Sequence, residues 1–233
     1  MDFKIQSEEL KTFLAKATKE YHESLPGSPA EEYLESRGLL TPENQEALSR
    51  FRIGFVENPL PGHEMYQNWL AIPYLRLGPS KSGPLKGWSI ATMKFRCIQK
   101  HNCEEVHPRI GKYMAHPGAN THLFNTLDIQ NSDNHVAICE GELDAITAHL
   151  CGIPAVAVPG VKNWKDHYYR LFKGFKTVWI FADGDTWGEG LAKKLSDGMG
   201  DKLRIIKMPD GEDVNSMVLK FGKSALLKGI GHE

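Results

Sequence analysis

The chain has 233 residues, of which 41% are hydrophobic and 24% are charged, and this is the composition of an ordinary globular protein. Its four cysteines are too few for a disulfide framework, so we expect a reducing, cytoplasmic setting. The first residues are charged throughout, and no apolar run approaches the ~18 residues that span a bilayer. We therefore expect neither a signal peptide nor a membrane segment.

The charge is unevenly distributed, although the net charge is only −1. Residues 61–132 carry 8 Lys and Arg against 4 Asp and Glu, whereas residues 1–60 carry 7 against 11 and residues 133–222 carry 11 against 13. A basic block between two acidic ones is compatible with a polyanion that binds between basic side chains and metal-neutralised carboxylates. By charge alone, an unevenly charged solvated surface is the simpler interpretation.

Residues 1–52 are predicted to form a helical N-terminal segment. Apolar residues recur at helical spacing from Ser7 to His22. A second helix is expected from Ala30 to Arg37, and Thr41 with Pro42 indicates the start of a third.

Residues 53–132 are predicted to form a basic, strand-rich subdomain of mixed α/β structure. Its strands are expected at 69–77, 87–98 and 111–114, separated by turns rich in Gly, Pro, Ser and Lys. The polar segment 131–134 is the predicted hinge to the next domain.

Residues 133–222 alternate between strand and helix patterns, which predicts a parallel sheet with helices on its faces. The strands are expected at 135–139, 154–158, 177–182 and 203–208. The helices are expected at 143–151, 164–172, 189–198 and 214–221. Residues 223–233 are predicted to be a C-terminal tail.

Carboxylates follow three of these predicted strands. Glu140 follows the first, Asp183 and Asp185 follow the third, and Asp213 belongs to an acidic cluster after the last. A parallel sheet brings such strand ends to one edge, where ligands bind. Aspartates also cap helices, but chance capping explains one such loop more easily than three. Neighbouring carboxylates repel each other unless a cation lies between them, so the pattern predicts a site for a hard divalent ion.

The motifs around these residues resemble the TOPRIM pattern of DnaG-type primases, type IA and type II topoisomerases and related nucleases. They are EGELDA at 140–145, DGDTWG at 183–188 and MPDGEDVNSMVLKFG at 208–222. Upstream, YLESRGL, FRIGF, MKFRC and GKYMAHPGANTHLFN resemble the primase polymerase core, so primase is the best subtype. The resemblance implies an α/β fold, with an N-terminal mixed α+β basic subdomain followed by a TOPRIM-type (Rossmann-like) parallel-sheet domain with helices on both faces.

The resemblance also implies an activity and its residues. A primase joins ribonucleotides on single-stranded DNA with Mg²⁺ or Mn²⁺. The implied catalytic residues are Glu140, Asp183 and Asp185, with Glu140 either a metal ligand or a general base. The implied metal ligands are Glu140, Asp144, Asp183, Asp185 and Asp213. The implied contacts to nucleotide or template are Lys94, Arg96, Lys112 and Asn215.

Asn215 stands where the family has a second aspartate, so we expect Asp213 to be the better ligand. The expected partners are the DNA template, nucleoside triphosphates, a replicative helicase and a zinc-binding module on another chain, in a bacterial or phage-infected cell. Two alternatives stay open: a TOPRIM nuclease using the same carboxylates, and a non-catalytic TOPRIM binding protein. The basic subdomain favours the primase.

Four possible zinc ligands lie within eleven residues: Cys97, His101, Cys103 and His107. Their spacing is not that of a usual zinc finger, which has two to four residues between cysteines and a longer loop. From sequence we favour a turn with incidental cysteines and exposed histidines over a zinc site.

Overall fold

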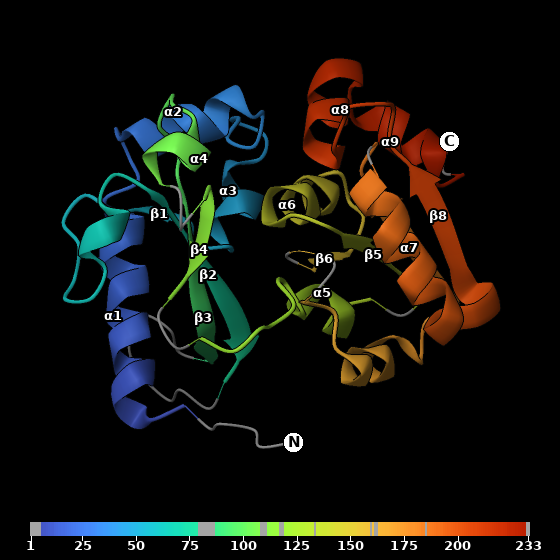
Figure 1. The fold of residues 1–233 in the computed structure, drawn as a ribbon, viewed down its shortest axis with the longest axis horizontal. Helices are drawn as coiled ribbons and strands as arrows, with labels where there is room; N and C mark the ends of the chain where they lie inside the picture. The colour runs from blue at the N-terminus through green and yellow to red at the C-terminus, as the bar shows by residue number, and fades with distance from the viewer. Residues whose placement is uncertain are drawn as a thin grey trace. The chain divides into compact units, whose positions relative to one another are not determined.

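The computed structural model describes residues 6–78, 87–107, 111–116, 119–132, 134–158, 160, 163–184 and 186–231, with only the backbone of 186–192. The chain divides into two compact units (Figure 1). The first consists of Met1–Ser36 and Leu40–His122, and the second of Arg37–Leu39 and Leu123–Glu233. The predicted hinge at 131–134 thus lies inside the second unit. Phe124 explains this division, because its backbone pairs with Ala157 of the second unit.

The first unit is built on a four-stranded antiparallel sheet with the order β1-β2-β3-β4. Its strands are β1 (Gly54–Phe55), β2 (Leu70–Leu77), β3 (Trp88–Arg96) and β4 (Tyr113–Ala115). Its helices are α1 (Glu8–Glu23), α2 (Pro29–Ser36), α3 (Gln45–Ser49), η1 (Glu64–Tyr66) and α4 (Cys103–Val106). The predicted strands are therefore present, and the stretch between the last two contains a short helix, α4.

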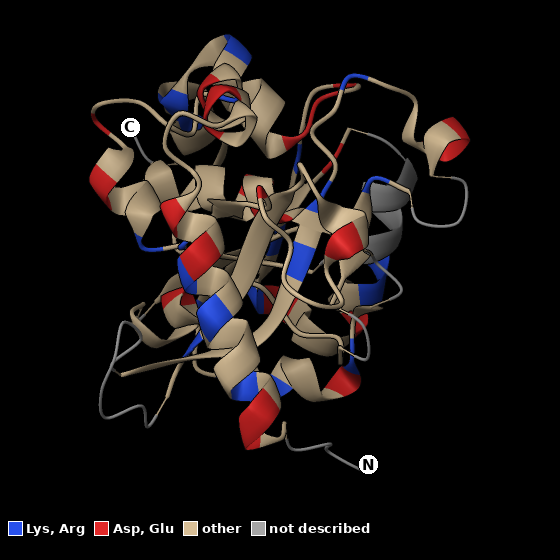
Figure 2. Cartoon of the chain, turned by 90° about the vertical axis from the view of Figure 1, so that its left-hand side faces the viewer, with Lys and Arg blue, Asp and Glu red and all other residues tan. Residues whose placement is uncertain are grey.

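Helix α1 shows how the sequence fixes an element of this unit. Ser7 caps it by accepting a hydrogen bond from the Leu10 N–H at 3.1 Å, as its position before the apolar repeat suggests. Leu14, Ala17 and Tyr21 form its buried face. Acidic and basic residues alternate along the other face (Figure 2), where they form i,i+3 and i,i+4 ion pairs.

The second unit is built on a four-stranded parallel sheet with the order β6-β5-β7-β8. Its strands are β5 (His135–Cys139), β6 (Ala155–Ala157), β7 (Thr177–Ala182) and β8 (Leu203–Lys207). Its helices are α5 (Leu127–Gln130), α6 (Glu142–Leu150), η3 (Asp166–Phe172), α7 (Thr186–Met199), η4 (Gly200–Lys202), α8 (Val214–Phe221) and α9 (Lys223–Gly229). The predicted fold class, an antiparallel-sheet unit followed by a parallel-sheet unit, is confirmed.

The two central strands of this sheet are buried on both faces, which their uninterrupted apolar sequences predict. Val136 and Ile138 pack with side chains of η3 and α7, including Phe172 and Leu195. Residues between them, such as Ala137, alternate to the other face of the sheet, and α6 packs against β5 and β6. Helices therefore lie on both faces, and the strand ends meet at one edge.

Two predicted elements differ in the structure. The segment before β7 is a 3₁₀ helix, Asp166–Phe172, where the sequence suggested an α-helix; its histidine and aromatic residues have low α-helix propensity. The predicted C-terminal tail contains helix α9, because Leu226 is apolar and becomes fully buried beside β8 and α8.

Candidate metal site at the strand ends of the second unit

Glu140 and Asp183 lie together at the ends of β5 and β7. The two strands pair in parallel register, Ile138 beside Ile180, so the residues after them meet at one edge. The Asp183 N–H donates to Glu140 Oε1 at 3.3 Å, and both side chains are half-buried. The structure thus brings the carboxylate of Glu140 to the backbone of Asp183, 43 positions later in the sequence.

Asp144 joins them from the first turn of α6. It is 7% exposed, and its Oδ1 accepts a hydrogen bond from the Asn215 N–H at 3.0 Å. A Cβ on Gly141 would lie 2.5 Å from Asp144 Oδ2, so only glycine lets this carboxylate turn back over the strand end.

The charges of all three carboxylates influence the pKa of the buried Cys139 thiol. Burial raises the pKa of Cys139 well above its ordinary value, and the negative charges of Asp144, Asp183 and Glu140 raise it further. The negative charges of three acidic groups therefore act on this strand end, and a bound cation would offset them.

The loop after Asp183 is held by the turn that follows β8. The Gly184 N–H donates to the Glu212 carbonyl at 3.0 Å, and the Gly211 N–H donates to the Gly184 carbonyl at 3.3 Å. A Cβ on Gly184 would lie 2.1 Å from the Pro209 carbonyl oxygen, so the position requires glycine. Asp185, the other aspartate of this motif, lies outside the described residues.

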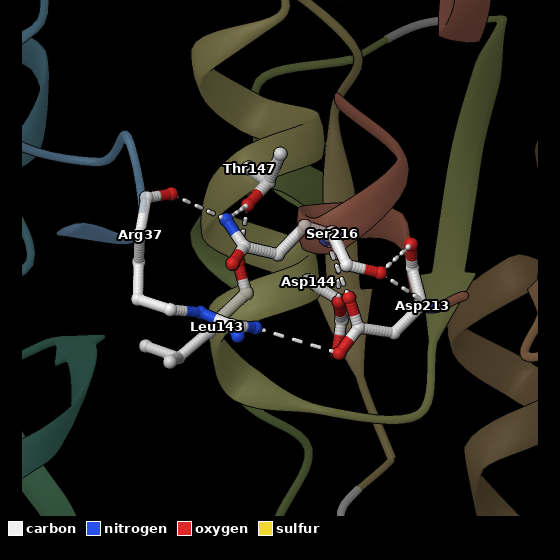
Figure 3. Close-up of polar contacts among 7 residues, drawn as sticks. Arg37, Leu143, Asp144, Thr147, Asp213 and Ser216 are labelled. Carbon is white, nitrogen blue, oxygen red and sulfur yellow. Dashed lines mark hydrogen bonds and ion pairs between the residues drawn. The ribbon is translucent and has the colours of Figure 1, made fainter. Parts of the chain in front are cut away.

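Asp213 has local partners (Figure 3). It is the N-cap of α8, where its Oδ1 accepts from the Ser216 N–H at 2.6 Å and the Ser216 hydroxyl completes a capping box. Its Oδ2 lies 3.4 Å from Arg37 Nη2. These contacts give Asp213 a structural role that the sequence did not reveal, and its role as a metal ligand stays a prediction.

Asn215 is 1% exposed and links three parts of the second unit. Its Nδ2 donates to the Arg37 carbonyl and to Thr147 Oγ1, each at 2.9 Å (Figure 3). Aspartate here would place a carboxylate oxygen against the Arg37 carbonyl, which explains why an amide fits this site. Its burial favours a packing role over the predicted contact with nucleotide or template.

The sequence also gave no role to Arg37 and Thr147. Arg37 contacts α8 through both its carbonyl and its guanidinium, although 176 residues separate it from Asp213. The Thr147 hydroxyl accepts the hydrogen bond from Asn215 and donates one to the Leu143 carbonyl at 2.8 Å. The signal available for Arg37 was its place in the YLESRGL motif.

The predicted basic residues lie on the sheet of the first unit. Lys94 and Arg96 are two residues apart on β3, and thus project from the same face. The Arg96 guanidinium stacks 4.6 Å from the ring centroid of Tyr113 and 5.5 Å from that of Tyr33. Lys112 immediately precedes β4, which pairs with β3. The sheet therefore gathers all three side chains within one unit.

The four possible zinc ligands also lie in the first unit. Cys97 Sγ is 3.4 Å from His101 Nε2 and 4.0 Å from His107 Nε2. These three residues form a cluster at the end of β3, where the sequence favoured an incidental turn, and Cys103 lies on the same segment.

Comparisons with known proteins agree with this architecture. A Toprim-like family model matches residues 137–218. The DNA primase of Escherichia coli (strain K12) is 27% identical over 240 residues, which cover 88% of this chain and 40% of that protein. A solved DnaG primase catalytic domain bound to single-stranded DNA has a TM-score of 0.68 and 22% identity, over 94% of this chain and 79% of that one.

The fold is that of a DnaG-type primase catalytic core with a Toprim-like unit, and the predicted resemblance is confirmed. The chain belongs to the same family as the Gene 57 protein of Mycobacterium phage D29, which is 45% identical over 166 residues covering 71% of this chain and all of that protein. The bacterial primases match most of this chain, but the match covers only about two fifths of their own length. Among the described residues, no helix combines the length and the apolar character needed to cross a membrane.

Proposed function

We propose that this chain is the catalytic core of a DNA primase, which joins ribonucleotides on a single-stranded DNA template by metal-dependent nucleotidyl transfer. The observation that carries the proposal is the convergence of Glu140, Asp144 and Asp183 on one strand end. The similarity to bacterial DNA primases supports this use of the carboxylates over that of a nuclease.

The donor set suits a hard divalent cation, because its atoms are carboxylate oxygens. We assign Mg²⁺ or Mn²⁺ to Glu140, Asp144, Asp183 and Asp185, with Asp213 as a further ligand from the last loop. Such an ion, when bound, neutralises the triphosphate and activates the 3′-hydroxyl for attack.

The chain's own side chains then orient the metal ligands, accept a proton and neutralise the charge of the phosphates. The hydrogen bond from the Asn215 N–H fixes the direction of the Asp144 carboxylate toward the strand end. Glu140 can act as a ligand or accept the proton of the attacking hydroxyl. Lys94, Arg96 and Lys112 offer positive charge to template and nucleotide phosphates.

The proposal includes partners. Its substrates are nucleoside triphosphates and a single-stranded DNA template, which the solved DnaG domain bound to such DNA supports. We expect a replicative helicase and a zinc-binding module on another chain to assist in choosing start sites.

One assay tests the proposal against its alternatives. The chain is incubated with single-stranded DNA, ribonucleotides and Mg²⁺ or Mn²⁺, and scored for new RNA, cleaved DNA or neither. New RNA from the wild type, lost in Glu140→Gln and kept in a control variant of the exposed Asp201, Asp201→Asn, supports the primase. Cleaved DNA in place of RNA identifies a nuclease, and neither product identifies a binding protein; both outcomes contradict the proposal.

A further inference from the structure

The cluster at the end of β3 brings nitrogen and sulfur ligands to one point. The Sγ of Cys97 and ring nitrogens of His101 and His107 all lie within 4.8 Å of one another. Cys97 is 2% exposed, and the two histidines are half-buried. A buried thiol facing two imidazoles is a preassembled set of soft and borderline ligands.

The distances fit a single tetrahedral cation. With Zn–S near ~2.3 Å and Zn–N near ~2.0–2.1 Å, tetrahedral geometry separates sulfur from nitrogen by ~3.5 Å. The observed separations from Cys97 Sγ are 3.4 Å to His101 Nε2 and 4.0 Å to His107 Nε2. A thiol hydrogen bond would explain one of these contacts, but it does not require a second imidazole at the same sulfur.

Cys103 is the candidate for a fourth ligand. It is partly buried and stands two residues after His101, while the group within 4.8 Å itself consists of Cys97, His101 and His107. Cys103 is the first residue of α4, and His107, four residues later, is its C-cap. Residues at i and i+4 share one face of a helical turn, so the second Cys–His pair is presented together.

The surrounding backbone holds the four residues in place. The Cys97 N–H donates to the Lys112 carbonyl at 2.9 Å, which ties the first ligand to the segment that enters β4. The His107 N–H donates to the Cys103 carbonyl at 2.8 Å, and Asn102 caps α4 through the Glu104 N–H. The His107 ring also packs edge-on against Trp69, with centroids 5.3 Å apart. These contacts limit the movement needed to bind an ion.

We propose that Cys97, His101, Cys103 and His107 form a structural Zn²⁺ site that fastens the segment 97–107 to the end of β3, next to Arg96. The repeat Cys-x₃-His-x-Cys-x₃-His delivers two Cys–His pairs, and four protein ligands leave no open position for substrate. The site is separate from the carboxylate edge of the second unit and does not depend on the primase proposal.

The first experiment measures metal content. The full chain is purified without chelator, and its zinc is determined by mass spectrometry. We expect about one zinc per chain, lost in Cys97→Ser and in His107→Ala. Cys151→Ser, which removes a buried cysteine of the second unit, is the control and keeps the metal. Zinc that persists in the ligand variants, or is absent from the wild type, overturns the proposal.

A second experiment separates loss of the site from loss of the fold. The chelated wild type is titrated with Co²⁺, whose d–d bands report tetrahedral geometry and whose charge-transfer band reports thiolate ligands. His101→Cys keeps four ligands, so it retains tetrahedral Co²⁺ with a stronger thiolate band, while His101→Ala loses it. A folded wild type that does not bind Co²⁺ tetrahedrally, or that carries a Cys97–Cys103 disulfide instead, contradicts the assignment.

Discussion

The two candidate metal centres differ in how the chain assembles them. The carboxylates of the second unit come from separate strand ends, and Asp183 stands 43 positions after Glu140. The Cys–His cluster of the first unit spans eleven residues, from Cys97 to His107, at the end of one strand. The oxygen ligands suit a hard ion that shares its coordination with phosphates, whereas the sulfur and nitrogen ligands suit an ion enclosed by protein. We accordingly propose that the first centre serves catalysis and the second serves stability.

The largest expected effect separates activity from stability at the carboxylate edge. Asp183→Ala should lower primer synthesis by ~10³-fold or more, because it removes a ligand to the catalytic ion. Its melting temperature in metal-free buffer should stay near that of the wild type, because the substitution removes electrostatic repulsion between neighbouring carboxylates. Steady-state primer yield and thermal unfolding are measured on the same preparation. A variant that still makes primers would remove Asp183 from the site.

The carboxylate edge was more predictable from sequence than the cluster, for a physical reason. Alternating strands and helices imply parallel pairing, and parallel pairing places Glu140 near Asp183 whatever the loop details. Whether Cys97 faces His107 depends on a short helix and a turn, whose geometry no periodicity specifies. The contacts of Asn215 and Arg37 could not be predicted from the sequence either, because packing between distant residues leaves no local sequence pattern.

Removal of zinc sharpens the contrast between the two centres. Chelation should lower the melting temperature, with a loss of ~4 kcal/mol if free zinc stood 1,000-fold above its Kd. Added Zn²⁺ should restore the original value and Mg²⁺ should not, because carboxylate and thiolate sites select different ions. His101→Ala should melt at the lower temperature with or without chelator. Differential scanning calorimetry measures each of these states, and a chelator-insensitive wild type would contradict the structural role.

The first unit also contains a buried histidine, His63, which does not belong to the Cys–His cluster. It is fully buried, between the Tyr21 hydroxyl at 2.9 Å and His116 at 2.8 Å. Burial, followed by the charge of His116, lowers the pKa of His63 from 6.5 to about 4, against a smaller opposing effect of Glu64. The folded protein therefore binds this proton less readily than the unfolded chain. Its stability contribution is complete above pH 6.5 and is lost as the pH falls toward 4.

Urea unfolding at pH 7 and pH 4.5, in chelator so that metal release does not contribute, measures this loss. We expect the free energy of unfolding to fall by ~2–3 kcal/mol more in the wild type than in His63→Asn, which cannot titrate. Equal pH dependence in the two proteins would show that His63 is already protonated, or does not differ between the folded and unfolded states.

Gly184 tests whether the carboxylate edge depends on close backbone contact. Gly184→Ala should destabilise the protein by ~2–3 kcal/mol, because its Cβ would lie 2.1 Å from the Pro209 carbonyl oxygen. Gly174→Ala is the matched control, since a Cβ there meets nothing within 4 Å. Chemical denaturation of the two variants gives the difference. Similar stabilities would mean that the loop after β7 moves away from the turn after β8 without cost.

Asp213 gives the smallest effect and separates capping from metal binding at one residue. Serine caps helices as well as aspartate does, so Asp213→Ser should keep the free energy of unfolding within ~0.5 kcal/mol, whereas Asp213→Ala should lose ~1 kcal/mol. The ion pair with Arg37 changes this little, because both side chains are partly exposed, at 25% and 34%. If Asp213 also binds the catalytic ion, both variants lower primer synthesis by ~10-fold, since neither retains a carboxylate. Wild-type activity in the stable Asp213→Ser variant would restrict Asp213 to its place at the start of α8 and leave the ion to the strand-end carboxylates.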